Sequence, residues 1–304
     1  MNLTKNVRTQ SRILGIFLVL TGATLWGVSG TVAQYLFQEK GYSVEWLVVV
    51  RLLAAGALLL LFPILKGNPQ VWVIWNTKEE RLRLFLFGVI GMLGVQYTYF
   101  AAIEAGNAAT ATLLQYLGPV FITCYVAVTI KTRPTAKQWV SIFLALLGTF
   151  LLVTNGNFQE LSISGWALFW GLASALALAF YTLQPISLLN SYGSAIVVGW
   201  GMIIGGIGMS FIHPPWKISG ELSFAAIVAV LFVIIFGTLI AFYCYLESLK
   251  YLKATETGLL ACAEPLSAAV LSVVWLKVQF GVTEWFGAFC IIMTIVLLSR
   301  EEKF

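Results

Sequence analysis

Residues 259–270 read LLACAEPLSAAV, an apolar and small-residue stretch that holds one carboxylate, Glu264, directly before Pro265. The stretch belongs to a longer apolar run, which at about 1.5 Å per residue is long enough to cross the roughly 30 Å core of a bilayer. An ionisable side chain near the middle of such a run costs on the order of 3 kcal/mol, so it usually faces a polar interior or a partner. The stretch therefore predicts a membrane bundle with a polar interior.

The composition of the whole chain agrees with a membrane protein. The 304 residues are 60% hydrophobic and only 10% charged, and their mean hydropathy is +0.90, which exceeds what a soluble domain needs. We predict an all-α polytopic membrane bundle of ten transmembrane helices, at residues 13–37, 45–66, 82–102, 106–130, 136–153, 163–183, 193–213, 223–247, 254–276 and 282–299. The little chain that remains between them leaves no room for a soluble catalytic domain.

Lysines and arginines near the span ends predict the orientation, because cytoplasmic loops carry an excess of them. With a cytoplasmic N-terminus, 14 of the 18 fall in inside segments and only Lys40, Lys217 and Lys277 fall outside, while Arg51 lies within a span. We therefore expect a multi-pass protein of the cell membrane with both termini in the cytoplasm. The basic net charge of +5 then reflects this bias, so we expect no nucleic-acid partner.

The chain matches itself in one ungapped register, at an offset of 146 residues. Tyr97 meets Tyr243, Tyr99 meets Tyr245 and Pro119 meets Pro265. Each half then holds five spans, and an odd number means that the second half enters the membrane from the opposite side. We predict two inverted five-helix repeats, residues 1–154 and 160–304, the arrangement that many transporters use for alternating access.

The order and spacing of several short segments across the ten spans resemble the EamA family of the drug/metabolite transporter superfamily. They are ATLWGVSG (23–30), VVVRLLAAG (48–56), LLQYLGPVF (113–121), SALALAFYT (174–182), LLACAEPLSAAV (259–270) and VTEWFGAFCIIMTIVLL (282–298). The resemblance implies a ten-helix bundle with a central cavity, lined mainly by spans 1, 3, 4, 6, 8 and 9. It also implies the transport of small organic metabolites, often outward from bacterial cells.

Glu264, Pro119, Pro265 and Arg51 are the candidates for coupling, gating or structural roles. Glu264 can couple substrate movement to protons, or it can donate a hydrogen bond across the bundle. Each proline removes a helical hydrogen bond at mid-span, which indicates either a hinge beside the site or a packing kink. Arg51 can pair with a substrate carboxylate or a buried acid, or extend towards the outer interface; because span two is peripheral in the family, a structural or gating pair is favoured.

A set of aromatic and amide side chains forms the candidate substrate-binding lining, together with Glu264. They lie within spans rather than at the membrane interfaces, where Trp and Tyr are normally enriched. The set is Trp26, Gln96, Tyr97, Tyr99, Gln115, Tyr116, Tyr181, Tyr243 and Tyr245. Such groups can hold a zwitterion or a sugar without a costly fixed charge. Each of them taken singly is also compatible with a packing role.

These features favour a secondary transporter that exports small polar metabolites, such as amino acids or related compounds, with proton coupling open. No nucleotide-binding segment is present. An enzyme is disfavoured, because a lone histidine, His213, and one central acid supply neither paired acids nor metal ligands. The four cysteines have no CxxC spacing, and we expect no cofactor and no metal.

A scaffold or lipid-handling protein without a small-molecule substrate is the alternative. Besides its substrate and membrane lipid, a homodimer partner is left open.

Overall fold

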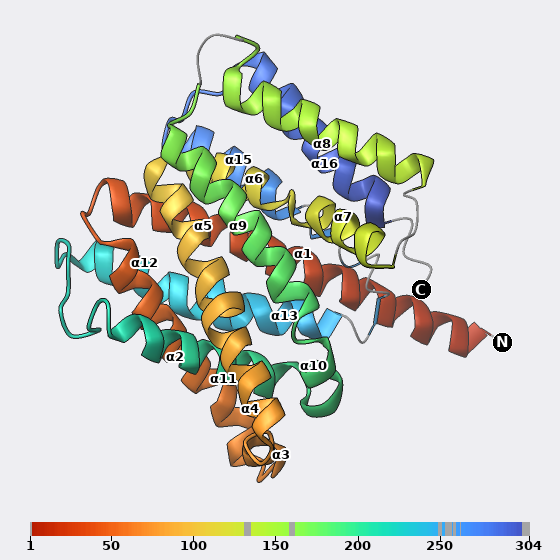
Figure 1. Ribbon diagram of the computed structural model, residues 1–304, viewed down its shortest axis with the longest axis vertical. Helices are drawn as coiled ribbons and strands as arrows, with labels where there is room; N and C mark the ends of the chain where they lie inside the picture. Colours follow the sequence, from red (N-terminus) through yellow and green to blue (C-terminus); the bar gives the residue numbers. More distant parts are fainter. Residues whose placement is uncertain are drawn as a thin grey trace.

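The computed structural model describes residues 2–130, 135–157, 162–248, 251–252, 257, 260–261 and 263–299. Within these ranges every regular element is a helix (Figure 1). The first half contains α1 (Asn2–Gln38), α2 (Val44–Leu65), α3 (Gln70–Val73), α4 (Lys78–Leu86), η1 (Phe87–Leu93), α5 (Gly94–Ala105), α6 (Ala108–Gln115), α7 (Gly118–Ile130) and α8 (Ala136–Thr154). The second half contains α9 (Gly165–Leu183), α10 (Ile186–Tyr192), α11 (Ser194–Ser210), α12 (Phe224–Ile234), η2 (Ile235–Ile240), α13 (Ala241–Ser248), α15 (Ala263–Val274) and α16 (Val282–Ser299).

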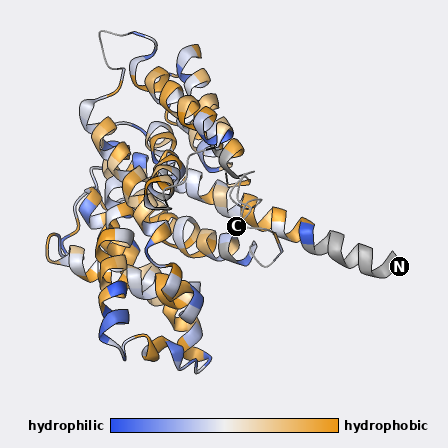
Figure 2. Ribbon diagram, turned by 45° about the vertical axis from the view of Figure 1, so that its right-hand side comes forward, coloured by the Kyte–Doolittle hydropathy of each residue, from blue (hydrophilic) through white to orange (hydrophobic). Residues whose placement is uncertain are grey.

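The polytopic helical bundle expected from the sequence is confirmed. Within the described residues, seven helical segments are long and apolar enough to cross a membrane, and three shorter apolar helices cover residues 194–210, 263–274 and 282–294. Together they fall at the ten predicted positions, although much of the opening of the predicted span 254–276 lies outside the described residues. Hydrophobic residues cover most of the length of these helices, and hydrophilic ones gather near their ends (Figure 2).

Side-chain caps fix where several spans begin. Ser43, Asn107, Thr135, Ser164 and Ser223 each stand just before a helix and accept a hydrogen bond from a backbone N–H of its first turn. These N–H groups have no partner within the helix, and leaving them unpaired near a membrane is costly. The caps therefore define the membrane boundaries of five spans from local sequence.

Helices α2 and α11 pack closely at small residues. A Cβ atom added at Gly206 would lie 2.8 Å from Leu53, and one added at Gly199 would lie 2.8 Å from Leu60. The residue numbers rise along α2 as they fall along α11, so the two helices are antiparallel. In the 146-residue register, position 53 corresponds to position 199 and position 60 to position 206. The two contacts are therefore equivalent to each other under the register.

Helices α8 and α16 show the same relation at the other side of the molecule, where they lie side by side (Figure 1). A Cβ atom at Gly148 would lie 2.7 Å from the carbonyl oxygen of Gly287, and Thr294 Oγ1 donates to the Ser141 carbonyl at 3.1 Å. Adding 146 to 141 and 148 gives 287 and 294. Equivalent helices thus run in opposite directions, as inverted topology requires.

Spans three and eight each contain a π-helical turn, which the sequence analysis did not predict. These turns are η1 and η2, and shifting η1 by 146 residues places it at 233–239, which overlaps η2. Gly91 in η1 corresponds to Gly237 in η2. Single π turns inside α-helices are rare and are frequent at functional sites.

Candidate transport site

Span four is broken at mid-membrane between α6 and α7, and span nine is broken just before α15. Pro119 is the second residue of α7 and Pro265 the third residue of α15. Proline is tolerated in the first turn of a helix, because an N–H there has no helical partner. The prolines therefore begin new helical segments, and the chain turns just before them, with the Leu117 N–H donating to the Leu114 carbonyl at 3.1 Å and the Glu264 N–H to the Ala261 carbonyl at 2.9 Å.

The two breaks meet at the side chain of Tyr116. Its hydroxyl oxygen lies 3.0 Å from the carbonyl oxygen of Ala261 and 2.9 Å from Oε2 of Glu264. Pro265 has no N–H to donate to the Ala261 carbonyl, which instead accepts from the Glu264 N–H and from the Tyr116 hydroxyl of span four. Tyr116 and Glu264 thus form a polar junction between the two broken spans, which we call the Tyr116–Glu264 junction.

Glu264 sits deep in the protein and yet keeps part of its surface accessible. Gly27 of α1 packs directly on its backbone: a Cβ atom at Gly27 would overlap the Glu264 carbonyl oxygen and Ser267 Oγ. Ser267 Oγ donates to the same carbonyl at 2.9 Å. The backbone of the break is therefore fixed by its neighbours, while the carboxylate itself is held by Tyr116 alone among the described residues.

Two further predicted residues connect the first half of span four to its neighbours. Gln115 Nε2 donates to Ser174 Oγ on α9 at 2.7 Å. The hydroxyls of Tyr99 and Thr112 are 2.8 Å apart, and Thr112 also donates to the Ala108 carbonyl at 2.7 Å. Gln115 and Tyr99 are buried, so these bonds order the wall beside the junction.

Trp26, Tyr245 and Tyr181 are partly buried aromatic residues of the predicted set. Trp26 packs on Phe242 with ring centres 5.0 Å apart and on Tyr245 at 5.1 Å. Tyr181 on α9 stacks on Phe87 at 5.5 Å, and its hydroxyl is within electrostatic range of Tyr245. These rings join spans one, eight and six, and the Tyr181 hydroxyl makes no hydrogen bond to any described residue.

The remaining predicted residues differ in their surroundings. Gln96 is 7% exposed and its amide has no hydrogen bond within the described part of the chain. The Tyr97 hydroxyl donates to Glu45 Oε1 at 3.2 Å, a partner for which the sequence gave no signal. Tyr243 is 60% exposed, so it is not enclosed with the other rings.

Arg51 is buried, at 5% exposure, and does not extend to the surface of the bundle. Its Nε donates to Thr238 Oγ1 at 2.5 Å, its Nη2 donates to the Gly237 carbonyl at 3.3 Å, and its guanidinium lies 4.9 Å from the centre of the Phe100 ring. Both hydrogen-bond partners belong to the π turn η2. Arg51 thus links span two of one half to span eight of the other.

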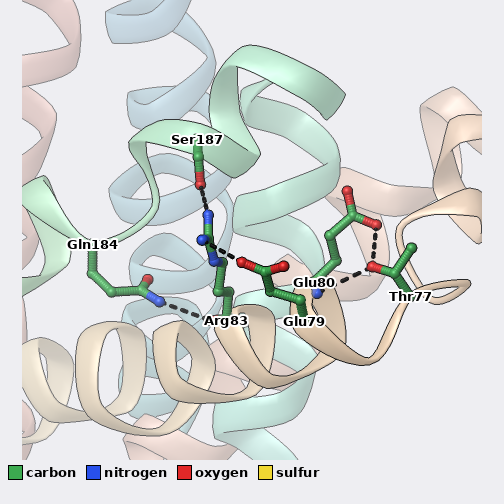
Figure 3. Close-up of polar contacts among 6 residues, drawn as sticks. All are labelled: Thr77, Glu79, Glu80, Arg83, Gln184 and Ser187. Carbon is green, nitrogen blue, oxygen red and sulfur yellow. Dashed lines mark hydrogen bonds and ion pairs between the residues drawn. The ribbon is translucent and has the colours of Figure 1, made fainter.

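A polar cluster ties α4 to the segment around α10, again across the two halves (Figure 3). Arg83 donates to Ser187 Oγ at 2.8 Å and to Glu79 Oε1 at 2.6 Å, and Gln184 Nε2 donates to the Arg83 carbonyl at 2.9 Å. The Tyr192 hydroxyl donates to Glu80 at 2.6 Å, and this bond raises the pKa of Tyr192 to about 12.

The loop after α1 is tied in a similar way to the loop before α12. Lys40 Nζ pairs with Glu221 Oε2 at 3.0 Å, and the Tyr42 hydroxyl donates to the Glu221 carbonyl at 3.1 Å. The hydrogen bond to Glu221 raises the pKa of Lys40. Neither end cluster could be found from the sequence, because its members are polar residues that lie far apart in the chain.

The cysteines do not gather into a site in the described part of the chain. Cys124 is exposed, whereas Cys244 and Cys290 are buried; Cys262 lies outside the described residues. Among the described residues, no group of three His, Cys, Asp or Glu side chains is arranged to hold a metal ion.

A helical membrane bundle in which the pairs α2–α11 and α8–α16 pack antiparallel, and in which two broken spans meet at a partly buried carboxylate, belongs to the class of polytopic membrane transporters. The model of the EamA-like transporter family matches residues 13–154 and again residues 165–300. The chain belongs to the EamA-like transporter family and is a membrane transporter.

Known proteins are similar to the chain over nearly its full length. It is 39% identical to the "Uncharacterized inner membrane transporter YicL" of Salmonella typhimurium, over 95% of this chain and 96% of that protein. It is 23% identical to the "Uncharacterized transporter YwfM" of Bacillus subtilis, over 97% of this chain and 96% of that protein. A crystal structure of a protein that is 16% identical shares the fold, with a TM-score of 0.63 over 97% of this chain and 99% of that one.

Proposed function

We propose that this transporter is a secondary carrier that exports small polar metabolites, such as amino acids or related compounds, by alternating access. The observation that carries the proposal is the Tyr116–Glu264 junction, where two broken spans from opposite halves meet deep in the bundle. Transporters commonly build their substrate and ion sites from discontinuous helices at the interface of their repeats. A gradient of substrate or protons drives the cycle.

In this proposal, residues 1–154 and 160–304 are the two repeats that exchange conformations. The antiparallel pairs α2–α11 and α8–α16 support it, as do the separate matches of the family model to each half. The first residue of the second repeat, at position 160, lies outside the described residues. Pro119 and Pro265 serve as hinges at equivalent places, and Arg51 links the two halves through η2.

The substrate site consists of predicted residues that are buried or partly buried: Trp26, Gln96, Tyr99, Gln115, Tyr116, Tyr181, Tyr245 and Glu264. Partial exposure of Trp26, Tyr181 and Glu264 is what an internal, water-accessible space would produce. The exposed Tyr243 and the Glu45-bound Tyr97 contribute least to this site. Hydroxyl and amide groups in such a space hold a polar molecule by hydrogen bonds.

The hydrogen-bond geometry of the junction supports proton coupling as part of the proposal. Tyr116 has one hydroxyl proton and two acceptors, the Ala261 carbonyl and Glu264. An ionised Glu264 only accepts, so it competes with Ala261 for that proton. A protonated Glu264 can instead donate to the Tyr116 oxygen, which frees the tyrosine to donate to Ala261. Protonation therefore completes the contact between the broken spans, and ionisation weakens it.

The excess of lysine and arginine at one side supports an orientation with both termini in the cytoplasm. In that orientation the cluster of Arg83, Gln184 and Tyr192 faces the cytoplasm, and the Lys40–Glu221 pair faces outward. Each cluster ties one half to the other near a membrane surface, where the access path opens and closes during transport.

The test of the proposed function compares metabolites inside and outside cells that express the wild type, Glu264→Gln or no transporter, by mass spectrometry at matched membrane abundance. We expect a small polar compound to be enriched outside only with the wild type. Glu39→Gln is the matched control, because Glu39 is exposed. If Glu264→Gln exports that compound as well as the wild type does, the proposal of proton coupling through Glu264 is wrong. If the wild type exports no compound, the result favours a scaffold or lipid-handling protein.

A further inference from the structure

Arg51 is a buried cation whose hydrogen-bonding capacity is only partly used. A guanidinium carries five N–H donors. Two of them reach described partners, from Nε to Thr238 and from Nη2 to the Gly237 carbonyl. Nη1 donates no hydrogen bond to a described residue. It is also not one of the fully buried polar atoms that lack a partner, so part of its surface is accessible. The free end of the guanidinium therefore keeps unused N–H donors, although Arg51 as a whole is only 5% exposed.

The described surroundings of Arg51 contain no counter-ion. Its two hydrogen-bond partners are a hydroxyl and a carbonyl, and Phe100 offers an aromatic face. Glu264 is near enough to attract Arg51 electrostatically, but its carboxylate is hydrogen-bonded to Tyr116 and forms no ion pair with Arg51. A buried charge without a partner is expensive at membrane depth. Arg51 thus has no ion pair with any described residue.

The second half of the molecule offers no equivalent cation. Adding 146 to 51 gives position 197, which is Val197, a fully buried apolar residue. The inverted repeat is therefore symmetric in its helices but not in its charge. Arg51 is the one buried lysine or arginine among the described residues.

We propose that the free end of Arg51 is a carboxylate-binding subsite of the transport site, so that the exported compounds carry a carboxylate group. The inference rests on the proposed function and names a determinant of its substrate class. The planar guanidinium suits a carboxylate because its N–H groups can donate in parallel to both oxygens. Thr238 and Gly237 hold the other edge in place, so the free end is oriented before the substrate arrives.

The test uses the compounds that the wild type enriches outside cells, and it asks two questions of them. The first is whether every enriched compound bears a carboxylate. The second is whether a synthetic methyl ester or amide of the same compound, loaded into proteoliposomes that contain the purified transporter, is still exported. We expect export of the acid to exceed that of its ester and amide by a factor of about 10–100, the range for losing hydrogen bonds to a charged group.

Three variants separate a substrate contact from a structural role. Arg51→Gln removes the charge and should abolish the preference for the acid over its ester, and Arg51→Lys should keep part of it. Thr238→Val removes the partner of Nε but keeps the charge and the bond to the Gly237 carbonyl, so it should lower the acid-to-ester ratio less than Arg51→Gln does. Size-exclusion profiles of the detergent-purified variants confirm that each one is folded.

Each outcome decides the inference. Export of compounds without a carboxylate, or an unchanged acid-to-ester ratio in Arg51→Gln, overturns the carboxylate subsite and leaves the proposed transporter standing. If Thr238→Val loses the preference for the acid over the ester to the same extent as Arg51→Gln does, the role of Arg51 is structural. If the wild type exports no compound, the proposed function and this inference fall together.

Discussion

The hydroxyl group of Tyr116 joins two spans that are both interrupted. Its neighbours are a main-chain carbonyl at 3.0 Å and a carboxylate oxygen at 2.9 Å. In a low-dielectric interior each of these acceptors is costly to leave unpaired. A single phenolic group therefore stabilises both the broken backbone of span nine and the side chain proposed to carry protons.

Replacing Tyr116 with phenylalanine tests this role. The variant keeps the ring but removes the donor to Glu264 Oε2 and one of the two donors to the Ala261 carbonyl, which still accepts from the Glu264 N–H. We therefore expect a loss of about 1–3 kcal/mol in stability. Tyr125→Phe is the matched control, since Tyr125 lies on α7 and is 59% exposed. Unfolding of the detergent-purified proteins in sodium dodecyl sulfate measures the difference. Equal stability of the two variants would contradict the account of the junction.

The sequence could single out these residues but not their pairing. Glu264 attracts attention because a carboxylate inside an apolar span is expensive, and Tyr116 because it lies in a span rather than at an interface. They are 148 residues apart, and no local pattern connects them. The same holds for Arg51 and Thr238, which are 187 residues apart. Contacts between halves depend on helix packing, which one sequence does not display.

At the scale of the element, close helix packing sets the position of the break in span nine. Gly27 of α1 faces the Glu264 carbonyl, and a Cβ atom there would lie 2.9 Å from the backbone nitrogen of Ala268, with closer contacts to Ser267 and Glu264. Small residues allow such approach between membrane helices. Span one therefore holds the turn before α15 by backbone contact.

Gly27→Ala should disturb this contact. The added methyl group overlaps rigid backbone atoms, so we expect a destabilisation of about 1–3 kcal/mol and a loss of export. Gly165→Ala is the matched control: nothing lies within 4 Å of its Cβ position at the start of α9, and an alanine there should be neutral or slightly stabilising. The same unfolding and export measurements apply. Normal export by Gly27→Ala would show that the contact is not needed.

The sequence predicts the membrane-spanning helices well, but it predicts only some of the places where those helices are interrupted. A hydrophobic run of about 20 residues fixes a membrane helix almost by itself, and Pro119 and Pro265 marked two breaks. The π turns η1 and η2 left no comparable mark, because one extra residue in a turn alters neither hydrophobicity nor length. Glycines in the same register, Gly91 and Gly237, were the available signal.

At the scale of the whole molecule, two halves of opposite direction are held together by symmetric pairs. The contacts of Leu53 with Gly206 and of Leu60 with Gly199 exchange under the 146-residue register. The register was visible in the sequence because the repeats keep tyrosines and prolines at equivalent positions. The single Arg51, by contrast, breaks the symmetry, and only the structure shows what it contacts.

The predicted orientation is tested by thiol labelling in intact cells, in a background whose four native cysteines are replaced by alanine. A cysteine at Glu39 should react with a membrane-impermeant maleimide, whereas one at Asn68 should react only after the cells are permeabilised. The basis is the excess of lysine and arginine in the segments assigned to the inside. The reverse labelling pattern would invert the topology and exchange the two end clusters between the membrane faces.

The most direct test of the Tyr116–Glu264 junction as the centre of transport is a double-mutant cycle on the export rate, built from Tyr116→Phe, Glu264→Gln and the double variant. Residues that act through one hydrogen bond have non-additive effects. We predict that the double variant exports no more slowly than the slower single variant. Additive losses, or a normal rate in either single variant, would contradict the account.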